Sequence, residues 1–305
     1  MDDGGPGQGT ARDPLRIALV GCGRMGQRHA AVIAADPRCT LAITLDRIGE
    51  RAEQVAERFG ARRVDHVPQQ IDAVVVATST TSHGEVAGPL LARGLWCLVE
   101  KPLAHSSAVA RALASPRCVV GHIERFNPAV RAAGQLSPRV VEARRTAPPT
   151  GRSADVDVVL DLMIHDLDLV LGWMAPGATI AWLDAVGVAV QGSAIDTASV
   201  RLRSSCGLTA SLLASRVAEQ RRRQVRCYAP GRYVELDLVS GRATIEGSEH
   251  TLDDPRDALT TQWQAFTSAV RGVRPSAAPG EDGLAAVRLA EQIQSVIRES
   301  SCEPA

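Results

Sequence analysis

The chain has 305 residues, 45% of them hydrophobic, so it is long enough for two packed domains and is neither a disordered chain nor a small disulfide-stapled fold. Lysine and arginine total 34, as do aspartate and glutamate, which excludes the global positive charge that holds nucleic acid or an anionic membrane. The seven scattered cysteines form no C-x-x-C pair and no zinc-finger spacing, which indicates reduced thiols in a cytoplasmic protein without a metal site.

Residues 1–13 are acidic and glycine-rich and contain no apolar core of a signal peptide, so we expect a disordered leader. No later run approaches the roughly 18 apolar residues of a membrane-spanning helix, so we expect no membrane insertion. Five short apolar runs then alternate with helix-like stretches, at residues 15–20, 41–45, 72–78, 96–100 and 118–121. Such alternation predicts a parallel sheet covered by helices on both faces.

A glycine-rich turn follows the first apolar run. In G-x-G-x-x-G, Gly21 makes the tight turn, Gly23 lets the backbone approach a pyrophosphate, and Gly26 lets helix and strand pack closely. Asp46 ends the second run, 20 residues past Gly26, where a carboxylate accepts hydrogen bonds from the adenosine ribose. This pattern predicts a dinucleotide site that favours NAD over NADP, although Arg47 could pair with a 2′-phosphate.

Lys101 directly follows the fourth run, in "VEKPLAHS". Open α/β sheets place their ligands at the carboxyl ends of strands, and Pro102 keeps Lys101 out of helical geometry. We therefore expect its ammonium group to enter the cleft; a solvated loop lysine is the alternative.

The third candidate site lies in an apolar helix pattern over 156–174. Asp161, His165, Asp168 and Gly172 fall on one stripe of this helix, and polar groups there must face a partner or a cavity. His165, oriented by Asp161, is suited to accept a proton from an alcohol. A core histidine paired with its own aspartate is the alternative interpretation.

The second half of the chain predicts a different kind of sheet. Runs such as 197–204, 208–215 and 232–247 alternate apolar and polar residues, which indicates an open, largely antiparallel sheet, and helices are expected near 257–272 and 281–299. We predict an α/β fold with a Rossmann NAD-binding domain over 14–121. A substrate-binding and oligomerisation domain follows over 122–305, its last helix packing back on the first domain.

The motifs together carry a family resemblance over nearly the whole chain. The glycine motif followed by "RH", then "TSTTSHGEVA", "VEKPLA" and Asp161-x-x-x-His165, resembles the Gfo/Idh/MocA family of NAD(P)-dependent sugar oxidoreductases. The resemblance implies that Lys101 and His165 flank the sugar carbon that loses hydride, with Asp161 beside them. The NAD-binding residues expected on this basis are Gly21, Gly23, Arg24, Met25, Gly26, Asp46, Arg47, Thr78, Ser79, Thr80, His83, Glu100 and Lys101.

Two further segments, 121–130 and 155–171, resemble the branch of this family that oxidises the 3-hydroxyl of UDP-N-acetylglucosamine ahead of an aminotransferase, in making 3-amino lipid A precursors. Related members act on UDP-N-acetylglucosaminuronic acid or myo-inositol, and a NAD-binding sensor without turnover is another alternative. Arginines recur around the presumed cleft, where a diphosphate needs bidentate cations, at positions 125, 144, 145 and 152. The expected substrate-binding residues are His122, Arg125, Asn127, Arg144, Asp161 and His165.

The strands over 180–246 present an alternating apolar face that one domain does not cover alone. We therefore predict a homodimer or a homotetramer.

Overall fold

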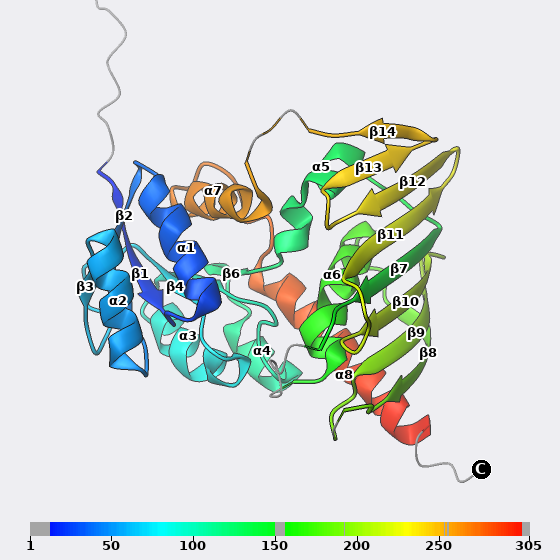
Figure 1. The fold of residues 1–305 in the computed structure, drawn as a ribbon, viewed down its shortest axis with the longest axis horizontal. Coiled ribbons are helices and arrows are strands. Elements are labelled where there is room, and N and C mark those ends of the chain that lie inside the picture. Colours follow the sequence, from blue (N-terminus) through cyan, green and yellow to red (C-terminus); the bar gives the residue numbers. More distant parts are fainter. Residues whose placement is uncertain (1–12, 150–155, 192, 253, 255, 301–305) are drawn as a thin grey trace, which may run out of the picture.

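Two β-sheets follow one another along the chain in this computed structural model (Figure 1). The structure describes residues 13–149, 156–191, 193–252, 254 and 256–300. The expected leader lies outside these ranges except for its last residue.

The first sheet has six parallel strands in the order β3-β2-β1-β4-β5-β6. Its central strands are almost wholly apolar and buried, as a sheet with helices on both faces requires. Ligands bind such sheets at the carboxyl ends of the strands, beside the point where the strand order reverses. The strands are β1 (Leu15–Val20), β2 (Cys39–Leu45), β3 (Arg62–Arg63), β4 (Ala73–Val76), β5 (Trp96–Val99) and β6 (Cys118–Val120). The helices that follow them are α1 (Arg24–Ala35), α2 (Gly49–Phe59), η1 (Thr80–Ser82), α3 (His83–Ala92) and α4 (Ser107–Leu113).

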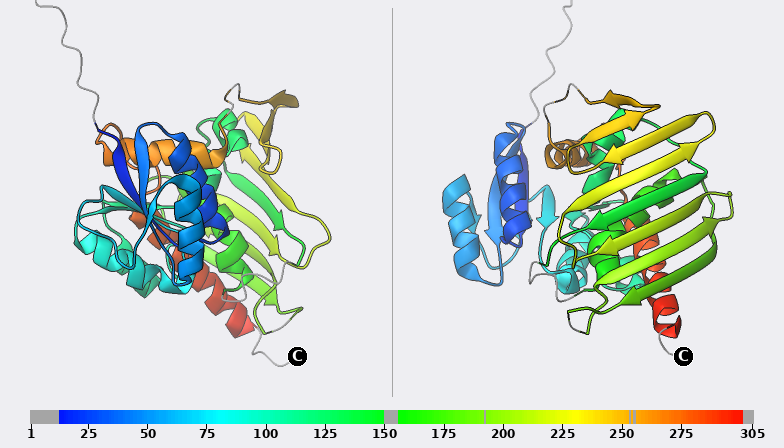
Figure 2. Two further views of the ribbon diagram at one scale, coloured as in Figure 1. Left: turned by 60° about the vertical axis from the view of Figure 1, so that its left-hand side comes forward. Right: turned by 45° about the vertical axis from the view of Figure 1, so that its right-hand side comes forward.

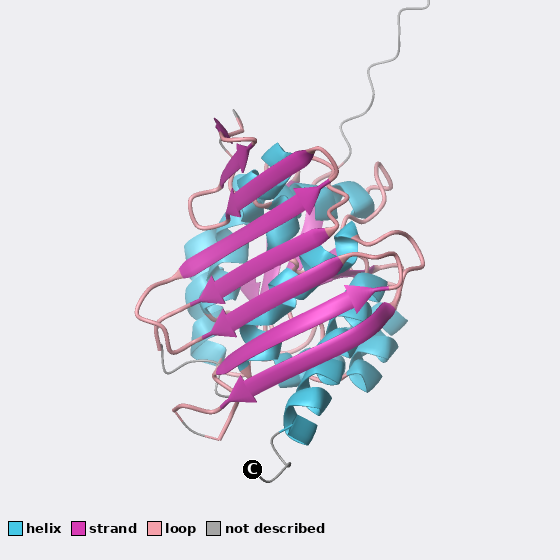
Figure 3. Cartoon of the chain, turned by 90° about the vertical axis from the view of Figure 1, so that its right-hand side faces the viewer, coloured by secondary structure: helices cyan, strands magenta, loops and turns pink. Residues whose placement is uncertain are grey.

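The second sheet has eight strands in the order β14-β13-β12-β11-β7-β10-β9-β8, and every pair is antiparallel except β7 with β10. Side chains alternate between a buried and an exposed face, and helices cover only the buried face (Figure 3). The strands are β7 (Val140–Thr146), β8 (Ile180–Val188), β9 (Thr197–Ser204), β10 (Thr209–Ser215), β11 (Arg222–Ala229), β12 (Arg232–Asp237), β13 (Arg242–Ile245) and β14 (Ser248–His250). The predicted fold class, a Rossmann sheet followed by an open, largely antiparallel sheet, is confirmed.

Four helical segments flank β7 in the sequence. Before it come η2 (Ile123–Phe126) and α5 (Pro128–Ala133), and after it come η3 (Val159–Met163) and α6 (Ile164–Trp173). The predicted apolar helix over 156–174 is therefore observed as η3 followed by α6. Segment η3 is a π-helical turn, with a wider ring of hydrogen bonds than an α-helix.

The last two helices, α7 (Ala258–Val270) and α8 (Gly280–Ser300), contact both halves of the molecule (Figure 2). In α8, Leu284 and Val287 belong to the core of the first sheet, whereas Leu289 and Ile293 belong to the core of the second. One helix therefore ties the two sheets together.

No helix within the described ranges is both long and apolar enough to cross a membrane. The six described cysteines are free thiols, and Cys302 lies outside the described residues.

Candidate active site

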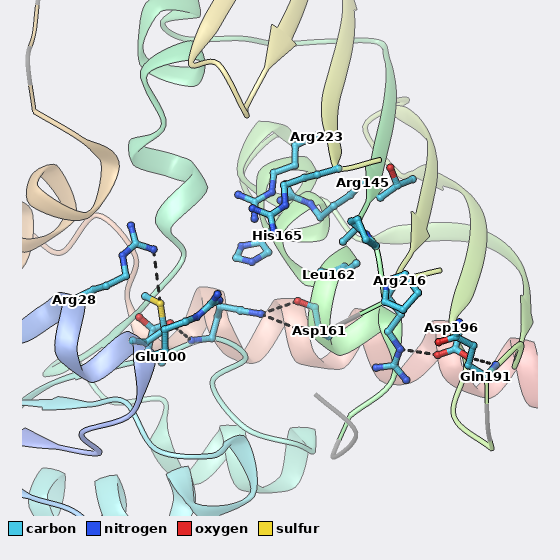
Figure 4. Close-up of a pocket in the computed structure, with 18 residues that line it drawn as sticks. Arg28, Glu100, Arg145, Asp161, Leu162, His165, Gln191, Asp196, Arg216 and Arg223 are labelled. Atoms are coloured by element: carbon cyan, nitrogen blue, oxygen red, sulfur yellow. Dashed lines mark hydrogen bonds and ion pairs between the residues drawn. The ribbon is translucent and has the colours of Figure 1, made fainter. Parts of the chain in front are cut away.

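A cavity of about 510 Å³ opens between the two sheets, next to the carboxyl end of β5 (Figure 4). The first half of the chain contributes Arg24, Met25, Arg28, Glu100 and Lys101. The remaining lining residues come from β7, η3, α6 and the loops around β9–β11: Arg145, Thr146, Ala147, Pro148, Pro149, Asp161, Leu162, His165, Gln191, Asp196, Arg216, Arg221 and Arg223.

The glycine turn between β1 and α1 has the geometry expected for binding a pyrophosphate. Gly21 has a φ of +93°, and a Cβ on Gly26 would lie 1.9 Å from the carbonyl oxygen of Gly21, so neither position accepts a side chain. A Cβ on Gly23 would meet no atom within 4 Å, and α1 begins without a side-chain cap. The open space and the free N–H groups at this helix start fit a dinucleotide.

Asp46 lies beside this turn, just beyond β2. Its Oδ2 accepts a hydrogen bond from the Cys22 backbone N–H at 2.6 Å, and its Oδ1 accepts one from the Ile48 N–H at 2.8 Å. The carboxylate is therefore held against the glycine turn, with lone pairs remaining for a ribose. Arg47 is exposed to solvent next to it.

The predicted residues 78–83 form the loop after β4. Thr78 and Ser79 are at least partly accessible, and Ser79 Oγ lies 3.0 Å from Ser82 Oγ, whereas Thr80 is buried in η1. His83 is buried, and its Nδ1 lies 3.0 Å from the carbonyl oxygen of Pro102. The imidazole of His83 therefore links this loop to the segment after β5 and does not line the cavity.

His29, which the sequence analysis did not identify as a site residue, supports the segment that carries Lys101. Its Nε2 lies 2.7 Å from Glu100 Oε1, and Glu100 Oε2 accepts a hydrogen bond from the Lys101 N–H at 3.2 Å. Burial alone would raise the pKa of Glu100, but the hydrogen bond and charge of His29 and the charge of Lys101 outweigh it and lower that pKa. Helix α1 thus holds the carboxylate that anchors the backbone of Lys101. The "RH" that follows the glycine motif is the signal that could have found it.

The side chain of Lys101 reaches across the cavity to η3. Its Nζ donates to the backbone oxygen of Asp161 at 2.7 Å and lies 3.3 Å from Asp161 Oδ1. Both side chains are about one-fifth exposed, so the ion pair borders the cavity. The Lys101–Pro102 peptide bond is cis.

His165 lies in the cavity wall on the side of Arg145 and Arg223 (Figure 4). Its Nδ1 is buried without a hydrogen-bond partner, so the predicted pairing with Asp161 is not formed in this structure. The Asp161 carboxylate contacts Lys101 instead, whose Nζ lies 3.3 Å from Asp161 Oδ1. Burial, followed by the charges of Lys101, Arg145 and Arg223, lowers the pKa of His165 well below its ordinary value, so the ring is neutral.

Arg125 lies outside the cavity lining and is already paired. Its Nε and Nη2 donate to the two oxygens of Asp168 at 2.8 and 2.6 Å, and its Nη1 donates to Asp282 at 2.7 Å. His122 is buried beside this cluster, with Nε2 3.5 Å from Asp168 Oδ1. These ion pairs join η2, α6 and the start of α8.

Asn127 caps α5. Its Oδ1 accepts a hydrogen bond from the Ala129 N–H at 3.0 Å, and its Nδ2 donates to the carbonyl oxygen of Leu238 at 2.9 Å. It too lies outside the cavity lining.

The adjacent arginines of β7 point to opposite faces of the second sheet. Arg144 is exposed on the uncovered face, whereas Arg145 is 1% exposed and lines the cavity. Arg145 donates from Nε and Nη2 to Asp166 at 2.9 and 2.7 Å and from Nη1 to Glu124 at 2.8 Å. Arg152 lies outside the described residues.

A parallel sheet with a glycine turn, and a cavity between the two sheets that brings together Lys101 and His165, define a dinucleotide-dependent dehydrogenase. Residues 15–116 match the model of an oxidoreductase family with an NAD-binding Rossmann fold. The chain belongs to the Gfo/Idh/MocA family of oxidoreductases. Because the matched fold binds NAD, the predicted cofactor is confirmed.

The chain is similar to enzymes that act on sugars and inositols. It is 35% identical to UDP-N-acetylglucosamine 3-dehydrogenase of Acidithiobacillus ferrooxidans, over 93% of this chain and 97% of that protein. A solved structure of that enzyme superposes with a TM-score of 0.86 and covers 94% of this chain and 98% of its own. Inositol 2-dehydrogenase of Rhizobium meliloti is 27% identical, over 91% of this chain and 95% of that protein.

Proposed function

We propose that this enzyme oxidises the 3-hydroxyl of UDP-N-acetylglucosamine to the 3-keto sugar with NAD, and that an aminotransferase then aminates the product. The observation that carries the proposal is the similarity to a UDP-N-acetylglucosamine 3-dehydrogenase along almost the whole of both chains. The strongly cationic lining of the cavity supports a substrate with a diphosphate.

The chemistry requires a proton acceptor and a cation at the reacting oxygen. Because His165 is neutral and lines the cavity, it can take the proton of the sugar hydroxyl. Lys101 is held by Asp161 with its ammonium group at the cavity edge, where it stabilises the negative charge that develops on that oxygen. The glycine turn would hold NAD, which would supply the hydride acceptor.

The substrate proposal is tested by following NADH absorbance at 340 nm with a panel of UDP-sugars and myo-inositol. UDP-N-acetylglucosamine should be oxidised fastest. Faster oxidation of myo-inositol would favour the second candidate, an inositol dehydrogenase, which the similarity to the Rhizobium enzyme supports. Binding of NAD with no turnover of any of these compounds would favour a sensor.

The site assignment is tested by Lys101→Met and His165→Asn. Each should lower turnover by roughly 10²-fold or more, as the loss of acid–base catalysis implies. Both variants should still bind NAD, because the glycine turn is unchanged. Unchanged rates in both would refute the assignment.

A further inference from the structure

Two arginines lie side by side on the cavity wall. Strands β7 and β11 are antiparallel neighbours, and Arg145 is directly opposite Arg223 in their register. Like charges in such a position destabilise a sheet unless a counter-charge compensates for them. Here one buried oxygen, Glu124 Oε1, accepts hydrogen bonds from Arg145 at 2.8 Å and from Arg223 at 3.2 Å.

The two arginines are not equally satisfied. Each of the three guanidinium nitrogens of Arg145 already donates to a carboxylate, of Glu124 or of Asp166. Among the described residues, the side chain of Arg223 makes only the hydrogen bond from Nη1 to Glu124, and this side chain is 37% exposed. Arg223 therefore has N–H donors left for a ligand, next to His165 (Figure 4).

Arg221 extends this cationic strip. Alternate residues of an extended segment share a face, and both Arg221 and Arg223 line the cavity whereas Arg222 does not. Arg221 is exposed, and no carboxylate of the described part of the chain pairs with it. Arg24 and Arg28 line the same cavity from α1.

We propose that Arg221 and Arg223 bind the diphosphate of the nucleotide-sugar substrate, so that the sugar ring lies between Arg223 and the Lys101–His165 pair. This inference rests on the proposed function for its substrate class. A diphosphate fits better than a single carboxylate because the strip offers two adjacent guanidinium groups, each able to bind phosphate oxygens bidentately. Neither Arg125, which is paired with Asp168 and Asp282, nor Arg144, on the opposite face, lines this cavity.

The test measures UDP binding by calorimetry, with NAD present at saturation so that UDP cannot occupy the cofactor site. Arg221→Ala and Arg223→Gln should each weaken UDP binding roughly tenfold, which corresponds to about 1.4 kcal/mol for a charge-assisted hydrogen bond. Arg222→Ala, the neighbour outside the cavity, is the matched control and should bind UDP like the unmutated enzyme. NAD affinity reports whether each variant is folded. Because Arg221 is exposed, its variant tests the assignment even if Arg223→Gln does not fold.

The outcomes separate this inference from the proposed reaction, since UDP binding requires no turnover. Arg-dependent UDP binding supports the subsite even if a different UDP-sugar is oxidised. UDP affinity that is unchanged in both variants overturns the subsite even if UDP-N-acetylglucosamine is the substrate. The subsite is also overturned if Arg223→Gln weakens the binding of glucuronate but leaves the binding of UDP unchanged. That result would assign the two arginines to a sugar carboxylate.

Discussion

Burial among cations gives His165 a specific pH signature. Its pKa lies well below the ordinary value of 6.5, so the imidazole stays neutral and able to accept a proton when the pH falls below 6.5. We expect the acid limb of the pH profile of kcat/KM to lie below pH 6.5. Arg223→Gln removes one of the cations that lower this pKa, so it should move the limb to higher pH.

Asp161→Asn is the control for this pH experiment. Because Asp161 contacts Lys101 and not His165, its substitution should lower kcat and leave the acid limb in place. An acid limb above pH 6.5 in the unmutated enzyme would contradict the assignment of His165 and favour Lys101 as the base.

Asp46 supplies a second prediction at the scale of a single residue. Its carboxylate is held beside the glycine turn by two backbone N–H groups, where it would repel a 2′-phosphate. We expect NAD to bind more tightly than NADP, and Asp46→Ala to narrow the difference, as measured by fluorescence titration with each dinucleotide. Arg47→Ala shows whether that arginine favours NADP. Tighter binding of NADP by the unmutated protein would exclude this interpretation.

At the scale of elements, two glycines of the turn between β1 and α1 have different roles: Gly26 is required for packing, and Gly23 for binding of the cofactor. A methyl group on Gly26 would collide with the Gly21 carbonyl, so Gly26→Ala should destabilise the protein by about 1–3 kcal/mol and lower its melting temperature by several degrees. Gly23→Ala adds a methyl group in open space, so the melting temperature should stay unchanged. The methyl group would stand where the pyrophosphate approaches the backbone, so NAD affinity should fall roughly tenfold. Equal effects of the two substitutions on melting temperature would contradict this division.

The elements also show how far the sequence could predict the fold. Five of the six parallel strands and the glycine turn were predictable because their signals are local: apolar runs, glycine spacing and Asp46. Strand β3 consists of two exposed arginines and has no apolar run to reveal it. Strand β7 was missed because its partners, β10 and β11, lie more than 60 residues later in the chain. The contact between Lys101 and Asp161 joins positions 60 residues apart in the sequence, so no local pattern could predict it.

The choice among arginines was equally beyond the sequence. Which of Arg144 and Arg145 faces the cavity depends on the register of β7, and a shift of one residue would exchange them. The same holds for the run Arg221–Arg223, in which every residue has the same chemistry and only the strand decides which two line the cavity.

At the scale of the molecule, the uncovered face of the second sheet predicts self-association. Large apolar side chains of β8 are exposed on this face, including Val186 at 58%, Val188 at 56% and Trp182 at 46%. We expect light scattering to give at least twice the chain mass of 32.3 kDa. Val186→Asp should favour the monomer, whereas Val273→Asp, at a position 67% exposed after α7, should not. A particle of one chain mass in the unmutated protein would contradict the prediction.

Because the last two helices complete the core of the first sheet, this sheet cannot finish folding while the chain is still being translated. All six strands of that sheet are translated by Val120, but its cores also contain Trp263 and Phe266 of α7 and Leu284 and Val287 of α8. The Val120 N–H donates to the Ala278 carbonyl at 2.8 Å, so β6 also lacks this hydrogen-bond acceptor until residue 278 has been translated. The nascent sheet therefore exposes apolar surface until the second sheet and the last two helices have been translated, and surface of this kind promotes aggregation of folding intermediates.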